Sequence, residues 1–212
     1  APVFRAAIDR CAELLRARLE QPLQTLLFTA GPALESTQLA QPAMLALAYA
    51  LTELWRACGV EPHLVLGHSV GELAAACAAG VCTLEDALEL AAARGALMAG
   101  LSGEGHMVAV DGDVAAIEAG LVRHPGVAIA AYNSPGSVVL SGERGAALAL
   151  CAELGVTGKP LRVSHAFHSA QMDPMLDAFE TELRRVSLSA PRLPLVSTLT
   201  GALAGDELAT SE

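Results

Sequence analysis

The chain has 212 residues, which is enough for one sizeable domain or for one domain that carries a smaller inserted one. Hydrophobic residues make up 53% of it and aromatic residues 3%, a balance typical of a compact globular protein and not of a disordered chain. The formal net charge of -10 provides no long-range attraction to nucleic acid or anionic lipid, and no apolar run reaches the roughly 20 residues that span a bilayer. No nucleic acid and no membrane are therefore expected as partners. Because the first residues contain no signal-peptide-like apolar region, a cytoplasmic location is expected.

The five cysteines form no C-x-x-C pair and lie among apolar neighbours in the sequence. They are Cys11, Cys58, Cys77, Cys82 and Cys151. Buried free thiols in a reducing compartment are the favoured interpretation, ahead of a disulfide or a metal site. No bound metal is therefore expected.

The first half of the chain predicts helices around one short strand. The expected elements are a helix over 4–19, a helix over 42–58, a strand over 63–66, and helices over 72–80 and 84–98. Pro42 is tolerated in the first turn of its helix, and Gly80 suits a helix C-terminus. Thr83 is expected to cap the last of these helices. The order around the strand is therefore helix, strand, tight turn, helix.

Beyond Gly103 the pattern changes to short β-like runs that alternate with short helices. The expected elements are strands over 106–110, 127–132, 137–142 and 161–165, and helices over 113–122 and 143–154. This β-α-β-β-α-β order is typical of a ferredoxin-like subdomain inserted into a larger α/β body. A helix over 173–186 and a Pro-rich strand over 191–201 are expected to follow.

The expected fold class is α/β, with a hydrolase-like large subdomain around a parallel sheet and an inserted ferredoxin-like small subdomain. Residues 1–103 are expected to form the first part of the large subdomain. Residues 104–163 would form the small subdomain, and residues 164–212 the return to the large one.

The pentapeptide GHSVG places Ser69 between a predicted strand and a predicted helix. On such a tight turn the small residues Gly67 and Gly71 avoid clashes, and a strained backbone exposes the serine hydroxyl. The N–H of Val70, at the start of the helix, could stabilise an oxyanion. This context favours a nucleophilic serine over a serine that only begins a helix, and the pattern alone leaves both interpretations open.

A nucleophilic serine needs a base, and the segment SHAFHS offers His165 and His168. The residues alone do not choose between them, and either could instead be a packed, hydrogen-bonded histidine. Arg94 lies in a predicted helix built otherwise largely from Ala, Leu and Met. Its guanidinium could bind a substrate carboxylate in bidentate fashion. An exposed arginine or an internal salt bridge is the interpretation that the residues alone favour.

Seven stretches of the chain, taken together, are informative about family. They are VFRAAIDRCAELL, TQLAQPAMLALAYAL, VEPHLVLGHSVGELAAACAAGV, LEDALELAAARGALM, AAYNSPGSVVLSG, LRVSHAFHSAQMDPML and PLVSTLTG. In this order they resemble the acyltransferase domains of modular type I polyketide synthases and, more distantly, the malonyl-CoA:acyl-carrier-protein transacylases of fatty acid synthesis. The resemblance covers nearly the whole chain and is far more specific than the pentapeptide.

The resemblance implies a role for each matching residue. Ser69 corresponds to the nucleophile that forms an acyl ester, and His168 to its base in a Ser-His dyad. Arg94 matches the arginine that holds the free carboxylate of malonate. The other residues implied at the substrate are His68, Val70, Asn133, His165 and Phe167. No metal belongs to this site.

The resemblance also implies partners. No bound cofactor is expected, because the substrate malonyl-CoA supplies the acyl group. The acceptor would be the phosphopantetheine thiol of an acyl carrier protein, and a ketosynthase domain would be a neighbour in the same synthase.

Substrate choice is a further implication of the resemblance. Malonyl-selective relatives tend to carry HAFH and a branched aliphatic residue after the nucleophile, whereas methylmalonyl-selective ones tend to carry YASH and GHSQG. Here the matching residues are HAFH and Val70. Phe167 is expected to crowd the space of an α-methyl group. Since one methyl group is worth only about 1–3 kcal/mol, the expected malonyl selectivity is real but incomplete.

The chain departs from the family pattern at both ends. Family members begin with a strand and a GQG motif whose Gln completes the oxyanion hole, and they continue into a YW segment and a region that supplies the carbonyl orienting the histidine. Neither motif occurs in this sequence. The terminal segments of the family are therefore expected to be missing, and loss of one oxyanion donor would lower turnover by about 10²–10³.

Two other functions remain as alternatives. An α/β-hydrolase esterase or thioesterase also uses a G-x-S-x-G turn, and it would need an Asp or Glu as a third triad member. An inactive acyltransferase fragment, or a docking scaffold for a carrier protein, would retain the motifs without the activity.

Overall fold

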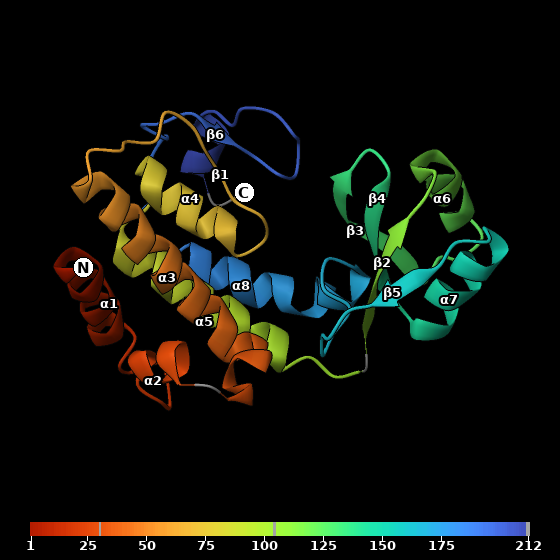
Figure 1. Cartoon of the computed structure of the whole chain (residues 1–212), viewed down its shortest axis with the longest axis horizontal. Helices are drawn as coiled ribbons and strands as arrows, with labels where there is room; N and C mark the ends of the chain where they lie inside the picture. Colours follow the sequence, from red (N-terminus) through yellow and green to blue (C-terminus); the bar gives the residue numbers. More distant parts are fainter. Residues whose placement is uncertain (30, 104, 211–212) are drawn as a thin grey trace. The chain divides into compact units, whose positions relative to one another are not determined.

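The computed structural model describes residues 1–29, 31–103 and 105–210. They form two compact units, one made of Ala1–Ala99 with Asp177–Glu212 and the other of Gly100–Leu176 (Figure 1). Residues 164–176, which the sequence placed in the large subdomain, thus belong to the second unit.

The first unit is largely helical and contains one small sheet. Its elements are α1 (Pro2–Leu14), α2 (Leu23–Phe28), the 3-10 helix η1 (Pro32–Glu35), α3 (Thr37–Ala57), β1 (Val65–Leu66), α4 (Gly71–Ala79), α5 (Leu84–Ala99), β6 (Leu195–Val196) and the 3-10 helix η3 (Asp206–Ala209). Helix α8 (Leu176–Leu183) begins at the boundary between the units. Helices α1, α3 and α5 pack against one another through buried residues such as Ile8, Leu45 and Leu88. Burying each of these side chains contributes about 1.5–3 kcal/mol.

Two helix boundaries in this unit differ from the prediction. Helix α1 ends at Leu14 instead of residue 19, but Leu15 is 1% exposed and Leu19 packs on the same core, so the apolar spacing continues beyond the helix. Helix α3 begins at Thr37, which places Pro42 inside it instead of in its first turn. Proline has no N–H to donate to the carbonyl four residues earlier, and the burial of this turn against the core offsets the loss.

The sheet of the first unit is parallel and short. Val65 pairs with Leu195, and Leu66 pairs with Val196. The four-residue strand predicted over 63–66 and the long strand predicted over 191–201 were therefore too long. Each strand has one described partner, so only the residues in register form a ladder.

The ends of the helices around this sheet agree with the prediction. Helix α4 stops at Gly80, which adopts the left-handed conformation with φ of 78°. Thr83 precedes α5, and its Oγ1 accepts a hydrogen bond from the Asp86 N–H at 3.1 Å. The predictions that Gly80 ends α4 and that Thr83 caps α5 are therefore confirmed.

The second unit is an antiparallel sheet covered by two helices. Its elements are β2 (His106–Asp111), α6 (Val114–Leu121), β3 (Val127–Ser134), β4 (Ser137–Gly142), α7 (Arg144–Glu153), β5 (Gly158–Pro160) and the 3-10 helix η2 (Ala170–Met175). The strand order is β3-β4-β2-β5, all neighbours are antiparallel, and α6 and α7 lie on one face (Figure 1). This is the ferredoxin-like arrangement predicted from the sequence.

Two elements of this unit lie elsewhere than predicted. The last strand is β5, whereas LRVSH (161–165) is not a strand. The ladder with β2 ends at Pro160, which is in register with Val108, and the Leu161 N–H still donates to the Met107 carbonyl at 2.8 Å. The helix predicted over 173–186 is split into η2 and α8, because Pro174 lies inside η2.

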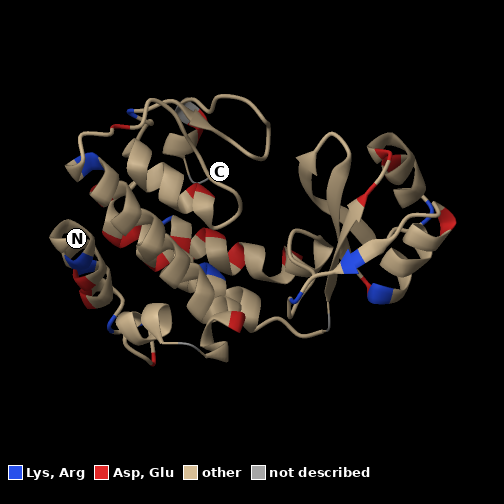
Figure 2. Cartoon of the chain, viewed as in Figure 1, with Lys and Arg blue, Asp and Glu red and all other residues tan. Residues whose placement is uncertain are grey.

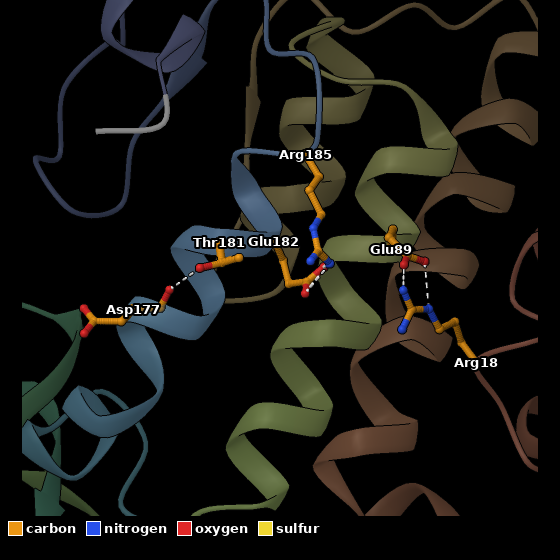
Figure 3. A network of polar contacts seen from close by, with 6 residues as sticks. All are labelled: Arg18, Glu89, Asp177, Thr181, Glu182 and Arg185. Atoms are coloured by element: carbon orange, nitrogen blue, oxygen red, sulfur yellow. Dashed lines mark hydrogen bonds and ion pairs between the residues drawn. The ribbon is translucent and has the colours of Figure 1, made fainter.

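Charged side chains of both signs are spread over the helices and turns (Figure 2). Figure 3 shows two ion pairs of the first unit, Arg18 with Glu89 on α5 and Arg185 with Glu182 on α8. Exposed or half-buried pairs of this kind contribute only about 0–1 kcal/mol each. No helix within the described ranges is long and apolar enough to cross a membrane.

Four of the five cysteines are buried or half-buried. Burial raises the pKa of the Cys11 and Cys82 thiols to about 12, so they stay protonated and unreactive. The exception is Cys58, which is exposed at the C-terminus of α3. The expectation of burial is wrong for this residue because the helix ends there and the chain turns at Gly59 with φ of 80°.

Candidate functional site

Ser69 lies on the turn between β1 and α4, and its backbone is left-handed with φ of 55°. A non-glycine residue in this conformation costs roughly 1–2 kcal/mol. Two backbone hydrogen bonds hold the turn: the Gly71 N–H donates to the His68 carbonyl at 2.9 Å, and the Glu72 N–H donates to the Ser69 carbonyl at 3.0 Å. The strained turn predicted from GHSVG is therefore present.

The two glycines of the pentapeptide play different parts. A Cβ on Gly67 would lie 1.9 Å from the Gly71 carbonyl oxygen, so only glycine fits there. A Cβ on Gly71 would meet none of the described neighbouring atoms within 4 Å. The prediction that a small residue is needed to avoid a clash is thus confirmed for Gly67 and wrong for Gly71. Gly71 takes part in the close contact through its backbone carbonyl.

Val70 is the N-cap of α4 and is 7% exposed. Its side chain belongs to the apolar core of the first unit. The first turn of a helix presents N–H groups and a partial positive potential, which is the electrostatic setting that an oxyanion hole requires.

Arg94 on α5 joins Ser69 to α3. Its Nη2 donates to Ser69 Oγ at 3.2 Å, and its Nη1 donates to Oε1 of Gln41 at 2.6 Å. None of the ion pairs in the described part of the chain involves Arg94. The salt bridge or exposed arginine that the residues alone favoured is therefore replaced by a half-buried guanidinium beside the turn serine.

The surroundings of Arg94 act on its charge in two directions. Burial lowers the pKa of the guanidinium, and the nearby Glu72 carboxylate raises it again. Glu72 lies in the first turn of α4, and its Oε1 accepts a hydrogen bond from the Thr198 N–H at 2.9 Å. Because an arginine stays protonated in proteins, the site keeps a partly desolvated positive charge next to Ser69.

Gly95 brings α5 close enough to α3 for these contacts. A Cβ at this position would lie 2.8 Å from the Thr37 carbonyl oxygen and 3.1 Å from the Gln38 Cα. Both are backbone atoms, which cannot move aside as the end of a flexible side chain can. The absence of a side chain at Gly95 therefore sets the spacing that lets Arg94 reach Gln41.

Gly95→Ala is expected to lower the free energy of unfolding by about 1–3 kcal/mol, because the added methyl group forces the two helices apart. Denaturant titration followed by circular dichroism measures the effect. Gly145→Ala is the matched control, since Gly145 lies in the first turn of α7 and the nearest atom to its Cβ is 3.9 Å away. The control should be neutral or stabilised by up to about 1 kcal/mol. Equal stability of the two variants would contradict the close-packing argument.

Gln41 is a site residue that the sequence reasoning missed. It is 6% exposed on α3, and its Nε2 lies 2.8 Å from Thr37 Oγ1 and 3.1 Å from the Met98 sulfur. The available signal was an amide placed directly among the apolar residues of LAQPAML, immediately before the helix predicted over 42–58. A buried amide of this kind needs polar partners, and Arg94 is one of them.

The HAFH segment is anchored within the second unit. Ala166 is fully buried, and a Cβ on Gly105 would lie 1.8 Å from its nitrogen, so the two backbones are in direct contact. The hydroxyl of Ser141, a fully buried polar residue of β4, donates to the Phe167 carbonyl at 2.5 Å. Ser169 Oγ donates to the Ala166 carbonyl at 2.7 Å. These contacts fix the backbone of Ala166 and Phe167, directly before the last histidine of the segment.

His165 and His168 differ in what surrounds them. The Leu101 carbonyl can only accept, so His165 Nε2 donates to it at 3.1 Å, and Nδ1 then accepts from the Ser164 hydroxyl at 2.8 Å. His168 is exposed, and its backbone is left-handed with φ of 57°. Both ring nitrogens of His165 are thus engaged in holding the segment, which argues against His165 as a base.

The other predicted residues are placed as follows. Phe167 is half-buried, and its ring centroid lies 5.8 Å from that of His165. Asn133 is exposed on β3, in the same unit as the HAFH segment, and His68 is exposed next to Ser69. Within residues 1–29, 31–103 and 105–210, no three His, Cys, Asp or Glu side chains are grouped to hold a metal ion.

The fold and the turn define an α/β protein with a strained G-x-S-x-G serine and an adjacent arginine. Residues 1–210 match the family described as acyl transferase domain. The spectinabilin polyketide synthase system protein NorB of Streptomyces orinoci is 44% identical over 215 residues, which cover 97% of this chain and 10% of NorB.

Solved structures give the same assignment. The acyltransferase domain from the second module of the salinomycin polyketide synthase has 46% identity and a TM-score of 0.88, covering 96% of this chain and 49% of that one. An acyl carrier protein S-malonyltransferase from Vibrio cholerae has 31% identity and a TM-score of 0.84, covering 95% of this chain and 70% of that one. The chain therefore belongs to the family of acyltransferase domains of modular type I polyketide synthases. It spans about half the length of the salinomycin synthase domain and about a tenth of NorB.

Proposed function

We propose that the protein transfers a malonyl extender unit from malonyl-CoA to the phosphopantetheine thiol of an acyl carrier protein. The observation that carries the proposal is the 3.2 Å contact between Arg94 Nη2 and Ser69 Oγ, the hydroxyl of the strained turn. A malonyl group has one methylene between its thioester carbonyl and its free carboxylate. A malonyl ester on Ser69 would therefore carry its carboxylate within reach of the guanidinium, whose fork matches a carboxylate in bidentate fashion.

The proposed reaction has two halves. In the first, His168 takes the proton of Ser69, and Ser69 Oγ attacks the thioester carbonyl. The oxyanion that forms is stabilised by the Val70 N–H at the start of α4. The carbon–sulfur bond then breaks, CoA leaves as a thiol with the proton from His168, and a malonyl ester remains on Ser69.

In the second half, the phosphopantetheine thiol loses its proton to His168 and attacks the ester. The bond to Ser69 Oγ breaks, and the serine recovers its proton from the imidazolium. No bound cofactor and no metal take part. The proposed partners are the acyl carrier protein that receives the malonyl group and the neighbouring ketosynthase domain of the synthase that uses it. Membership in the polyketide synthase family and the acyl carrier protein named for the Vibrio cholerae relative support these partners.

Malonyl over methylmalonyl selectivity is part of the proposal. Its support is the HAFH segment, whose half-buried Phe167 is held by the hydrogen bond from Ser141 to its carbonyl. A rigid aromatic side chain there disfavours an α-methyl group, by the roughly 10- to 200-fold that one methyl group is worth. His165 would support Phe167, and Asn133 and His68 remain predicted substrate contacts.

Intact-mass spectrometry tests the proposed function directly. The protein is incubated with malonyl-CoA and then with a carrier protein bearing phosphopantetheine. We expect one malonyl adduct, located on the peptide that contains Ser69, which disappears as the carrier protein gains the same mass. The absence of an adduct, or rapid release of free malonate without transfer, would instead indicate a non-catalytic domain or a hydrolase.

Arg94→Ala is expected to lower kcat/KM for malonyl-CoA by about 10- to 150-fold, the effect of losing charge-assisted hydrogen bonds worth about 1.5–3 kcal/mol. The rate with acetyl-CoA, which has no free carboxylate, should fall far less. Stopped-flow or mass-based acylation rates measure both substrates. Arg16→Ala is the control, because the Arg16 side chain is 76% exposed in the same unit. Equal loss with both substrates would mean that Arg94 acts only on the fold.

A further inference from the structure

We propose that Gln41 is a positioning residue that holds Arg94 ready for the substrate carboxylate. The inference rests on the proposed function, because it assigns Arg94 to that carboxylate. Its basis is the 2.6 Å hydrogen bond from Arg94 Nη1 to Gln41 Oε1, made by an amide that is 6% exposed. The described hydrogen bonds connect Gln41 to Ser69 through the guanidinium of Arg94.

The orientation of the Gln41 amide is set by its partners. An arginine can only donate, so the atom facing Arg94 must be the amide oxygen. The amide nitrogen then points toward acceptors, and it donates to Thr37 Oγ1 at 2.8 Å and to the Met98 sulfur at 3.1 Å. All three contacts agree with one orientation and leave no rotated alternative that satisfies them. The guanidinium is thereby fixed from one side by a buried, pre-oriented acceptor.

The neutral charge of this partner matters as much as its position. A carboxylate at the same place would form an ion pair and use the positive charge of Arg94. The Gln41 amide accepts one hydrogen bond from Arg94 and adds no negative charge beside the guanidinium. The described electrostatic influence of opposite sign on Arg94 comes from the Glu72 carboxylate, which raises its pKa. The guanidinium has five N–H donors, of which the described contacts use one toward Gln41 and one toward Ser69. The arrangement therefore suits an anionic acyl group and selects against a neutral one.

Gln41→Glu tests this role because it keeps the shape of the side chain and adds a charge. The new carboxylate would pair with Arg94 and repel the substrate carboxylate. We expect the ratio of kcat/KM for malonyl-CoA to that for acetyl-CoA to fall at least 10-fold, mainly through a higher KM for malonyl-CoA. Gln38→Glu adds the same charge at an exposed position of the same helix and should leave the ratio within 2-fold of the wild type.

Gln41→Met provides a second variant, since it fills the same space without a buried charge. It removes the acceptor for Arg94 Nη1, so the malonyl-to-acetyl ratio should fall about 3- to 10-fold while the melting temperature stays near that of the wild type. A merely structural role would lower both rates together and leave the ratio unchanged. An unchanged ratio in folded Gln41→Met and Gln41→Glu overturns the proposal for Gln41. A wild-type protein that takes no malonyl group at all would instead overturn the proposed function.

Discussion

Ser69→Gly is expected to abolish acyl-enzyme formation without destabilising the protein. The substitution removes the hydroxyl that the proposed mechanism requires, and loss of a nucleophile costs about 10⁴- to 10⁶-fold in turnover. Glycine also accepts the φ of 55° without the roughly 1–2 kcal/mol that a side chain costs there. Glycine also has more conformational freedom in the unfolded chain, which lowers the stability of the variant by about 0.4–1 kcal/mol. The net change in the free energy of unfolding should therefore lie between about 0 and 1.6 kcal/mol in favour of the variant.

Ser69→Ala is the matched comparison, because it loses the same hydroxyl and keeps the strained backbone. Intact-mass spectrometry with malonyl-CoA should show no adduct for either variant, while thermal unfolding should rank Ser69→Gly at or above Ser69→Ala. A malonyl adduct that persists in both variants would show that another residue carries the acyl group. A glycine variant clearly less stable than the alanine variant would contradict the strain at this turn.

His168→Gly is expected to slow acylation by about 10²- to 10⁴-fold, the usual contribution of a general base. Glycine again suits the backbone, since the φ of His168 is 57°. The variant should therefore fold, and its missing ring leaves room for imidazole from solution. Single-turnover acylation measured at increasing imidazole concentration should show partial recovery of the rate.

His165→Ala provides the contrast within the same segment. Its ring donates to the Leu101 carbonyl and accepts from Ser164, so its loss should lower stability by about 1–3 kcal/mol through the unpaired groups left behind. Imidazole should not restore its rate. The assignment of the base would be reversed if added imidazole rescued His165→Ala and left His168→Gly unchanged.

Local chemistry made several features predictable from the sequence. The C-terminus of α4 follows from Gly80 and the start of α5 from Thr83, because each residue type satisfies a helix end through its own backbone or side chain. The need for glycine at Gly67 follows from the tightness of the turn. The β-α-β-β-α-β order of the second unit could also be read from alternating patterns.

Other features depended on partners that are distant in the sequence. The strand predicted over 63–66 is observed as Val65–Leu66, because in the described part of the chain those are the residues that pair with β6. The predicted strand over 161–165 was replaced by β5, because the residues in register with β2 are Gly158–Pro160. Strand limits are set by the neighbouring strand, and apolar spacing within one segment contains no information about where that neighbour begins or ends.

The candidate site divides in the same way. The sequence by itself determined the turn that holds Ser69, because small residues at fixed offsets and a following helix are local requirements. It also supplied the motifs that identify the family. Only the tertiary structure decided that Arg94 contacts Ser69 and that a buried amide, Gln41, is its partner. Those contacts join α3, α4 and α5 across the chain, and they depend on how closely Gly95 lets the helices approach, a distance that no local pattern encodes.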